Sequence, residues 1–220
     1  MKRINTIKAT ISKILEKVNN LKNKELILDT KSAKKTLSQF LDYISRNDCL
    51  SEEGIYSLQE DCKDSIEIIT VISGSSKIDT YSYVQINNEL HYIYNRPCLL
   101  CVTRGNAGKL LFLPKGIYAT NTNAMLLCIN EGKLAELNIK NNTEEENYLR
   151  FLKFNLESKF MQFSSISDLS VFLMSVAIKD IEFCFNKHNQ EVETIANLER
   201  SLELITEKIN LLYLKIKNIN

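Results

Sequence analysis

An unbroken heptad repeat of apolar residues runs through the C-terminal part of the chain. Eight consecutive positions alternate at spacings of three and four, and glutamates such as Glu199, Glu203 and Glu207 lie between them. A helix with an apolar stripe of this length needs a partner to cover it, and the regular period favours coiled-coil pairing. At ~1.5 Å per residue the stripe is about 37 Å long. The seam consists of Ile195, Leu198, Leu202, Ile205, Ile209, Leu212, Ile216 and Ile219.

A second heptad repeat lies at the start of the chain. Its seam consists of Ile4, Ile7, Ile11, Ile14, Val18 and Leu21. β-Branched residues dominate both seams, which indicates that the two helices pair with each other, within one chain or across a dimer. We therefore predict helices over residues 1–28 and 188–220. The alternative is that each helix packs its apolar face on the chain's own globular domain.

Residues 29–187 have the pattern of a sheet domain. Short apolar segments, such as residues 66–73, 98–103 and 110–113, are separated by turns that contain Gly, Asn or Pro. Closely spaced strands joined by such turns predict a compact, mainly antiparallel sheet. After these strands, Asn142 and Thr143 are expected to cap a helix. The predicted fold class is α+β, a mainly antiparallel sheet domain flanked by two coiled-coil helices. The apolar face of the domain's helix consists of Tyr148, Phe151, Leu152, Leu156 and Phe160.

The residue inventory argues against a self-sufficient enzyme. His91 and His188 are the only histidines, which leaves little for a histidine-based triad or metal site. The segment RGNAGK has two residues between its glycines where a phosphate-binding loop has four. Cys98 and Cys101 form a CxxC pair, but no second pair follows at zinc-site spacing, so both are interpreted as buried thiols. We expect no metal site and no cofactor.

The composition indicates an ordinary soluble protein. The 28 Lys and Arg residues nearly balance 27 Asp and Glu, which gives a net charge of +1. The six cysteines are too sparse for a disulfide scaffold, and polar residues rather than a signal peptide follow Met1. No apolar run reaches the ~18 residues that a membrane span requires. The expected location is the cytoplasm, without membrane contact.

One stretch of the chain nevertheless carries a local positive charge. No acidic residue occurs between Glu89 and Glu131, whereas four basic residues do. Arginine can pair bidentately with guanine and asparagine with adenine, so the polar residues of this stretch are candidates for contact with DNA. Ordinary turn chemistry is the alternative explanation for the asparagines. The candidate DNA-binding residues are Arg96, Arg104, Asn106, Lys109, Lys115, Thr120, Asn121, Thr122 and Asn123.

The order of these segments resembles the specificity (S) subunit of type I restriction-modification systems. In that family a target recognition domain has an arginine-glycine turn between strands, then a strand start rich in Thr and Asn, and a long helix after the domain. Here the first element falls on Arg104, Gly105 and Gly108, and the second on residues 120–124. The helix entry falls on Gln190 and the residues after it.

The resemblance implies a non-catalytic subunit that reads double-stranded DNA. Separate methyltransferase subunits, and a restriction or translocase subunit, would carry out the chemistry. Two departures from the family stand out: the prolines that usually precede the closing helix are replaced by IEFCFNKHNQE, and one recognition domain stands where full-length S subunits have two. The chain is thus similar to a half-subunit, which implies a homodimer or a second half-subunit as partner. The competing hypothesis is a coiled-coil scaffold protein that carries a small sheet domain and binds another protein.

Overall fold

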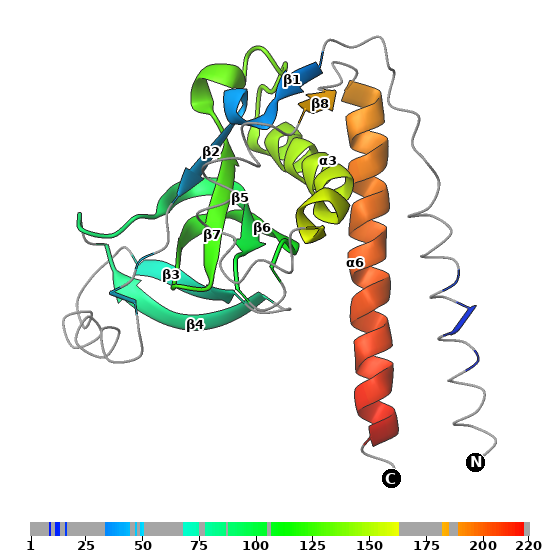
Figure 1. Cartoon of the computed structure of the whole chain (residues 1–220). Helices are drawn as coiled ribbons and strands as arrows, with labels where there is room; N and C mark the ends of the chain where they lie inside the picture. Colours follow the sequence, from blue (N-terminus) through cyan, green and yellow to red (C-terminus); the bar gives the residue numbers. More distant parts are fainter. Residues whose placement is uncertain are drawn as a thin grey trace.

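A curved β-sheet, a helix packed on it and a long second helix make up the described part of the chain (Figure 1). The computed structural model describes residues 9, 12–13, 16, 34–44, 47, 49–50, 68–74, 78–86, 88–104, 107–162, 182–184 and 189–217. None of the described helices has the length and apolar character that a bilayer-spanning helix needs.

The sheet has six strands in the order β2-β7-β5-β6-β3-β4. All neighbours are antiparallel except β3 and β6, so the predicted, mainly antiparallel sheet is confirmed. A separate two-stranded ribbon joins β1 (Lys34–Thr36) to β8 (Glu182–Cys184). The six strands are β2 (Leu41–Ile44), β3 (Ile68–Gly74), β4 (Ile78–Gln85), β5 (Ile93–Val102), β6 (Leu110–Thr120) and β7 (Ala124–Ile129).

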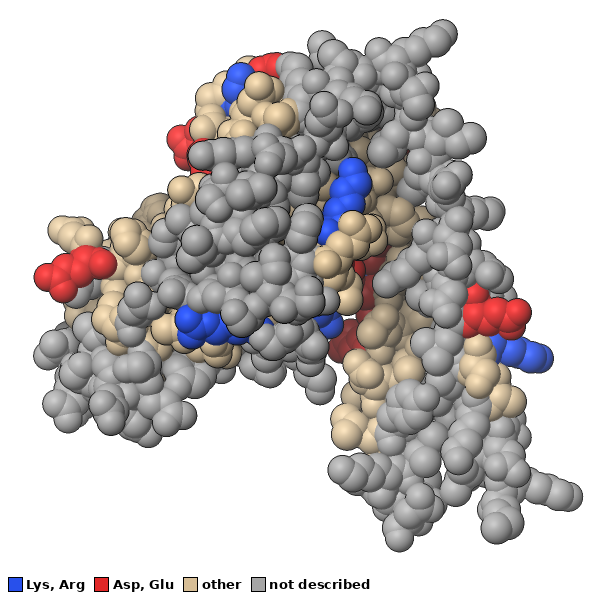
Figure 2. Space-filling model, viewed as in Figure 1, with Lys and Arg blue, Asp and Glu red and all other residues tan. Residues whose placement is uncertain are grey.

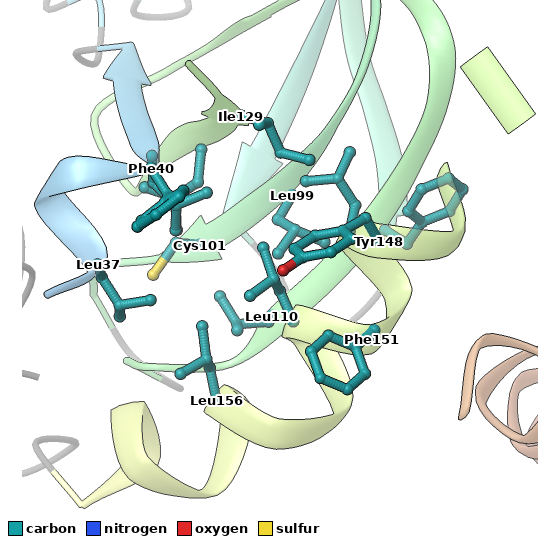
Figure 3. Packing of buried hydrophobic residues seen from close by; sticks show 14 of the residues in the cluster. Leu37, Phe40, Leu99, Cys101, Leu110, Ile129, Tyr148, Phe151 and Leu156 are labelled. Carbon is teal, nitrogen blue, oxygen red and sulfur yellow. The ribbon is translucent and has the colours of Figure 1, made fainter. Parts of the chain in front are cut away.

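Helix α3 (Asn142–Met161) packs on one face of the sheet. Its N-terminal cap is Asn141, whose Oδ1 accepts a hydrogen bond from the Glu144 amide at 3.0 Å, so the predicted cap at Asn142 and Thr143 lies too late in the chain. The predicted apolar face is confirmed, because all five of its residues are buried. Leu37 and Phe40, in and just after the 3-10 helix η1 (Leu37–Gln39), close one side of this core (Figure 3).

Strand β5 is buried on both faces. Leu99 and Cys101 belong to the core under α3, whereas Cys98 and Leu100 belong to a second cluster on the opposite face of the sheet. Successive side chains of a strand point to opposite faces, so the two thiols of the CxxC pair cannot bind one ion together. Burial raises the pKa of Cys98 and Cys101 well above its ordinary value. These thiols are therefore packing residues, as the sequence indicates. Within the described ranges no three His, Cys, Asp or Glu residues gather as metal ligands do.

Helix α6 (Asn189–Lys217) lies beside α3 and extends beyond the sheet domain (Figure 1). Of the predicted seam, Ile195, Leu202 and Ile209 are buried, and Leu198 and Ile205 are half-buried. The side chains of Leu212 and Ile216, and the whole of Ile219, lie outside the described residues.

The N-terminal seam also lies outside the described residues. In that segment only Ala9, Ser12, Lys13 and Glu16 are described, and all four are helical and exposed. Pairing of the two seams, and the domain boundaries at residues 28 and 187, therefore stay predictions.

Candidate nucleic-acid interface

Two turns meet at one end of the sheet. The first turn (residues 103–109) joins β5 to β6, and the second turn (residues 120–123) joins β6 to β7. The Thr103 amide donates a hydrogen bond to the Asn123 carbonyl at 2.9 Å, which ties the turns together. The Asn121 side-chain amide lies 3.4 Å from Ser73 Oγ, so the end of β3 lies against the second turn as well.

The first turn is held against the C-terminal end of α3. Its Gly108 has φ +87°, and a Cβ at this position would lie 2.3 Å from the Phe160 carbonyl oxygen. The Leu110 amide, just after the turn, donates to Glu157 Oε1 at 3.3 Å. Gly108 is buried, whereas Arg104 is exposed and Lys109 is half-buried. The turn thus has a fixed base and presents Arg104 to solvent. Asn106 lies outside the described residues.

The second turn is held by its own side chains. Thr120 Oγ1 donates to the Ala124 carbonyl at 3.0 Å, and Asn121 Oδ1 accepts from the Asn123 amide at 3.1 Å. Thr120 and Asn121 are buried, so the structure gives them the ordinary turn chemistry that was the alternative to DNA contact. Thr122 and Asn123 are half-buried and remain the candidates in this turn.

Buried Asn47 fixes the second turn from the side, a role that the sequence does not reveal. Its Nδ2 donates to the carbonyls of His91 at 2.8 Å and of Thr120 at 3.3 Å, and its Oδ1 accepts from the His91 amide at 2.7 Å. These partners lie 44 and 73 residues away in the sequence. No local motif signals contacts of that range.

We expect Asn47→Ala to lower the free energy of unfolding by about 1–3 kcal/mol, because two carbonyls and an amide would lose a hydrogen-bond partner. Urea unfolding measures the change. Asn210→Ala, at an exposed position on α6, is the control and should stay within about 0.5 kcal/mol of the wild type. Equal effects of the two substitutions would contradict the role of Asn47.

Arg96 has a structural role at the start of β5. Its guanidinium donates to Glu131 at 3.0 Å, to Glu145 at 2.5 Å and to the Ile129 carbonyl at 2.7 Å. Burial opposes its charge, but these carboxylates outweigh that effect and raise the pKa of Arg96. The stretch without acids is therefore not free of acids in space, and its local charge is smaller than the sequence suggests.

Lys115 is exposed and lies in β6 next to Gly116, which pairs with Arg96. Figure 2 shows described acidic and basic side chains scattered over the visible face, with no continuous basic field among them. On this face the described basic residues are thus single positions and not a continuous patch.

No family model and no curated protein sequence matches the chain. Solved structures do match. The S subunit of a type I restriction-modification system from M. genitalium superposes with a TM-score of 0.56 over 99% of this chain and 55% of its own length, at 13% identity. The fold is that of a type I S subunit. The HsdS subunit from Thermoanaerobacter tengcongensis superposes with a TM-score of 0.54 over 96% of this chain and 49% of its own, at 9% identity. The chain thus spans about half the length of both S subunits, and the resemblance found in the sequence is confirmed at the level of the fold.

Proposed function

We propose that the chain is the DNA-recognition subunit of a type I restriction-modification system and reads one half of a bipartite target. The observation that carries the proposal is the hydrogen-bonded pair of turns at one end of the sheet, with exposed Arg104 on the first turn and half-buried Thr122 and Asn123 on the second. Side chains on a rigid base can read base edges without a large cost in conformational entropy. The S-subunit fold supports the same function.

The candidate residues divide into three groups under this proposal. Arg104, Thr122 and Asn123 would contact base edges, and Lys109 would contact the phosphate backbone. Lys115 would contact phosphate only if the DNA reaches the middle of β6. Arg96, Thr120 and Asn121, which hold the protein's own structure, would support the site rather than touch DNA.

Helix α6 offers a surface for the partners of the proposed complex. Leu204, Leu211 and Leu214 are each more than half exposed, although Leu202 and Ile209 on the same helix are buried. An apolar stripe in solvent favours binding to another protein. We propose that methyltransferase subunits, with or without a restriction subunit, and a second half-subunit bind along this helix.

The proposed contact of Arg104 with a base predicts a sequence-dependent loss of affinity. A duplex library with random sequence first identifies the preferred half-site, and fluorescence anisotropy then measures affinity. Arg104→Ala should cost about 1–3 kcal/mol on the preferred site and little on other duplexes. Arg104→Lys keeps the charge but loses the bidentate geometry, so most of the loss should persist. Lys208→Ala, an exposed lysine on α6, is the control.

Lys109→Ala separates phosphate contact from base reading. It should weaken binding to all duplexes alike and reduce the slope of log affinity against log salt by about one. If the wild-type chain binds no duplex in a salt-dependent way, the DNA-recognition proposal fails and the scaffold hypothesis replaces it.

A further inference from the structure

Four charged side chains meet between α3 and α6, and three of them are largely buried, whereas Glu203 is 38% exposed. Arg150 and Lys153 project from one face of α3, and each contacts both Glu199 and Glu203 of α6. The Arg150–Glu203 and Lys153–Glu203 contacts are 2.6 and 3.1 Å long. The side chains of Arg150, Lys153 and Glu199 are only 12%, 11% and 5% exposed. We call these four residues the charge cluster.

The charge cluster is continuous with the sheet. The Arg150 guanidinium lies 3.9 Å from the centre of the Phe112 ring, which belongs to β6 and is buried. Burial would lower the pKa of Lys153, but the attraction of Glu199 and Glu203 outweighs it and raises that pKa. Lys153 therefore stays charged, and the cluster joins α6 through α3 to the strand that leads into the second turn.

The ion pairs and core contacts of α6 with the described residues of the domain lie in the first half of the helix. Val192 and Ile195 belong to the core under α3, and Glu203 is the last residue of the charge cluster. The C-terminal end of α6 extends beyond the sheet domain (Figure 1). The charge cluster ends at Glu203. From there to Lys217 the helix is about 21 Å long, at ~1.5 Å per residue.

A small change in the angle of α6 at the charge cluster displaces the far end of the helix by several ångströms. A tilt of ~10° at the charge cluster would move the end of a ~21 Å arm by about 4 Å. This displacement is similar to the ~3.4 Å rise of one base pair. A helix that spaces two recognition domains can discriminate a one-base-pair change in spacing only if its joint to each domain is stiffer than this.

Buried ion pairs are suited to such a joint. Apolar contacts are non-directional and tolerate sliding and small rotations. A buried charge that loses its partner costs far more, because it stays desolvated without compensation. Movement of α6 would separate Glu199 from both cations at once.

We propose that the charge cluster fixes α6 at one angle on the recognition domain and thereby sets the spacing between half-sites that the assembled protein accepts. Arg150, Lys153, Glu199 and Glu203 are positioning residues in this proposal, because they act through the helix and touch no DNA. The role in spacing rests on the proposed function, whereas the fixed angle does not.

The test measures the angle without DNA. Ala135 and Asn210, which are both exposed, are replaced by cysteines and spin-labelled in a background without reactive native cysteines. Pulsed electron paramagnetic resonance then measures the distance between the domain and the far part of α6. Glu199→Gln with Glu203→Gln removes both acids of the cluster while keeping side-chain volume. Glu193→Gln with Glu207→Gln changes two exposed glutamates of the same helix and is the matched control.

A second variant covers the case in which loss of both acids prevents folding. Lys153→Met with Glu199→Met replaces one buried ion pair by apolar side chains, a change that proteins often tolerate with little loss of stability. It should leave the unfolding midpoint near that of the wild type but still broaden the distance distribution. If the pair only stabilised the fold, the width of the distance distribution between the two labels would stay unchanged.

The second readout is the spacer preference on DNA. Two preferred half-sites are joined by spacers that differ in steps of one base pair, and the assembled protein is titrated with each. We expect the wild type and the control to favour one spacer by about tenfold over its neighbours, and the cluster variants to favour it by less than about threefold. The half-site sequence itself should stay unchanged.

The outcomes separate the two proposals. An unchanged distance distribution in the cluster variants overturns the fixed angle. A broader distribution with an unchanged spacer profile overturns the role in spacing. If the wild type discriminates no DNA, the proposed function fails, and the distance measurement alone then decides whether the charge cluster fixes the helix.

Discussion

Gly108→Ala is expected to destabilise the protein by about 2–4 kcal/mol. Part of the loss comes from the left-handed backbone, since φ is +87° and a side chain there costs about 1–2 kcal/mol. The rest comes from overpacking, because the added Cβ would lie 2.3 Å from the Phe160 carbonyl oxygen, a backbone atom that cannot rotate away. Urea unfolding with unchanged m-value measures the difference.

Gly132→Ala is the matched control for that substitution. Its Cβ would meet only the Asn130 side chain at 3.2 Å, and Gly132 is exposed, so we expect a change below about 1 kcal/mol. If Gly108→Ala were as mild as this control, the first turn would not be packed against α3. A variant that folds at reduced temperature should also bind the preferred DNA more weakly, because the base of the first turn would have moved.

The second large effect is expected at Ile209. This residue is 6% exposed, and Ile209→Asp would place a carboxylate in its position. We expect a loss of about 3–4 kcal/mol from the lost apolar burial and the cost of desolvating the acid. The loss should shrink as pH falls toward the pKa of the new carboxyl group, because the neutral acid is cheaper to bury.

Leu211→Asp makes the same chemical change two residues further along the helix. Leu211 is 52% exposed, so the difference between the two variants isolates burial from the lower helix propensity of aspartate. The control should lose less than about 1 kcal/mol. Equal losses at Ile209 and Leu211 would contradict the buried seam in this half of α6.

Local patterns predicted the elements of the fold well. The 3.6-residue period of Tyr148, Leu152 and Leu156 identified the buried face of α3, and the apolar run at residues 98–102 identified a strand with buried thiols. These signals are reliable because one helix face or one strand carries all of the information. The cap of α3 was placed one residue too late, since three polar residues in a row offer several caps of similar quality.

The candidate site was predicted less completely because its contacts are distant in the sequence. Nothing near Arg96 reveals that Glu145, 49 residues later, lies 2.5 Å from it. Asn121 is surrounded by residues that suit either DNA contact or an Asx turn, and its burial and its bond to the Asn123 amide favour the second. The charge cluster joins residues about 50 positions apart, so the heptad pattern shows the glutamates of α6 but not their partners.

The way the two turns are built has a consequence for how targets can change. The residues that hold them, Gly108, Thr120 and Asn121, are buried and hydrogen-bonded to the protein's own atoms, and Arg104 is exposed. Under the proposed function, substitution of Arg104, Thr122 or Asn123 changes the side chains that contact bases. The buried residues that hold the two turns stay the same. New target sequences would then be accessible by single substitutions that cost little folding stability. The domain could change its target specificity in evolution while every variant along the way still folds.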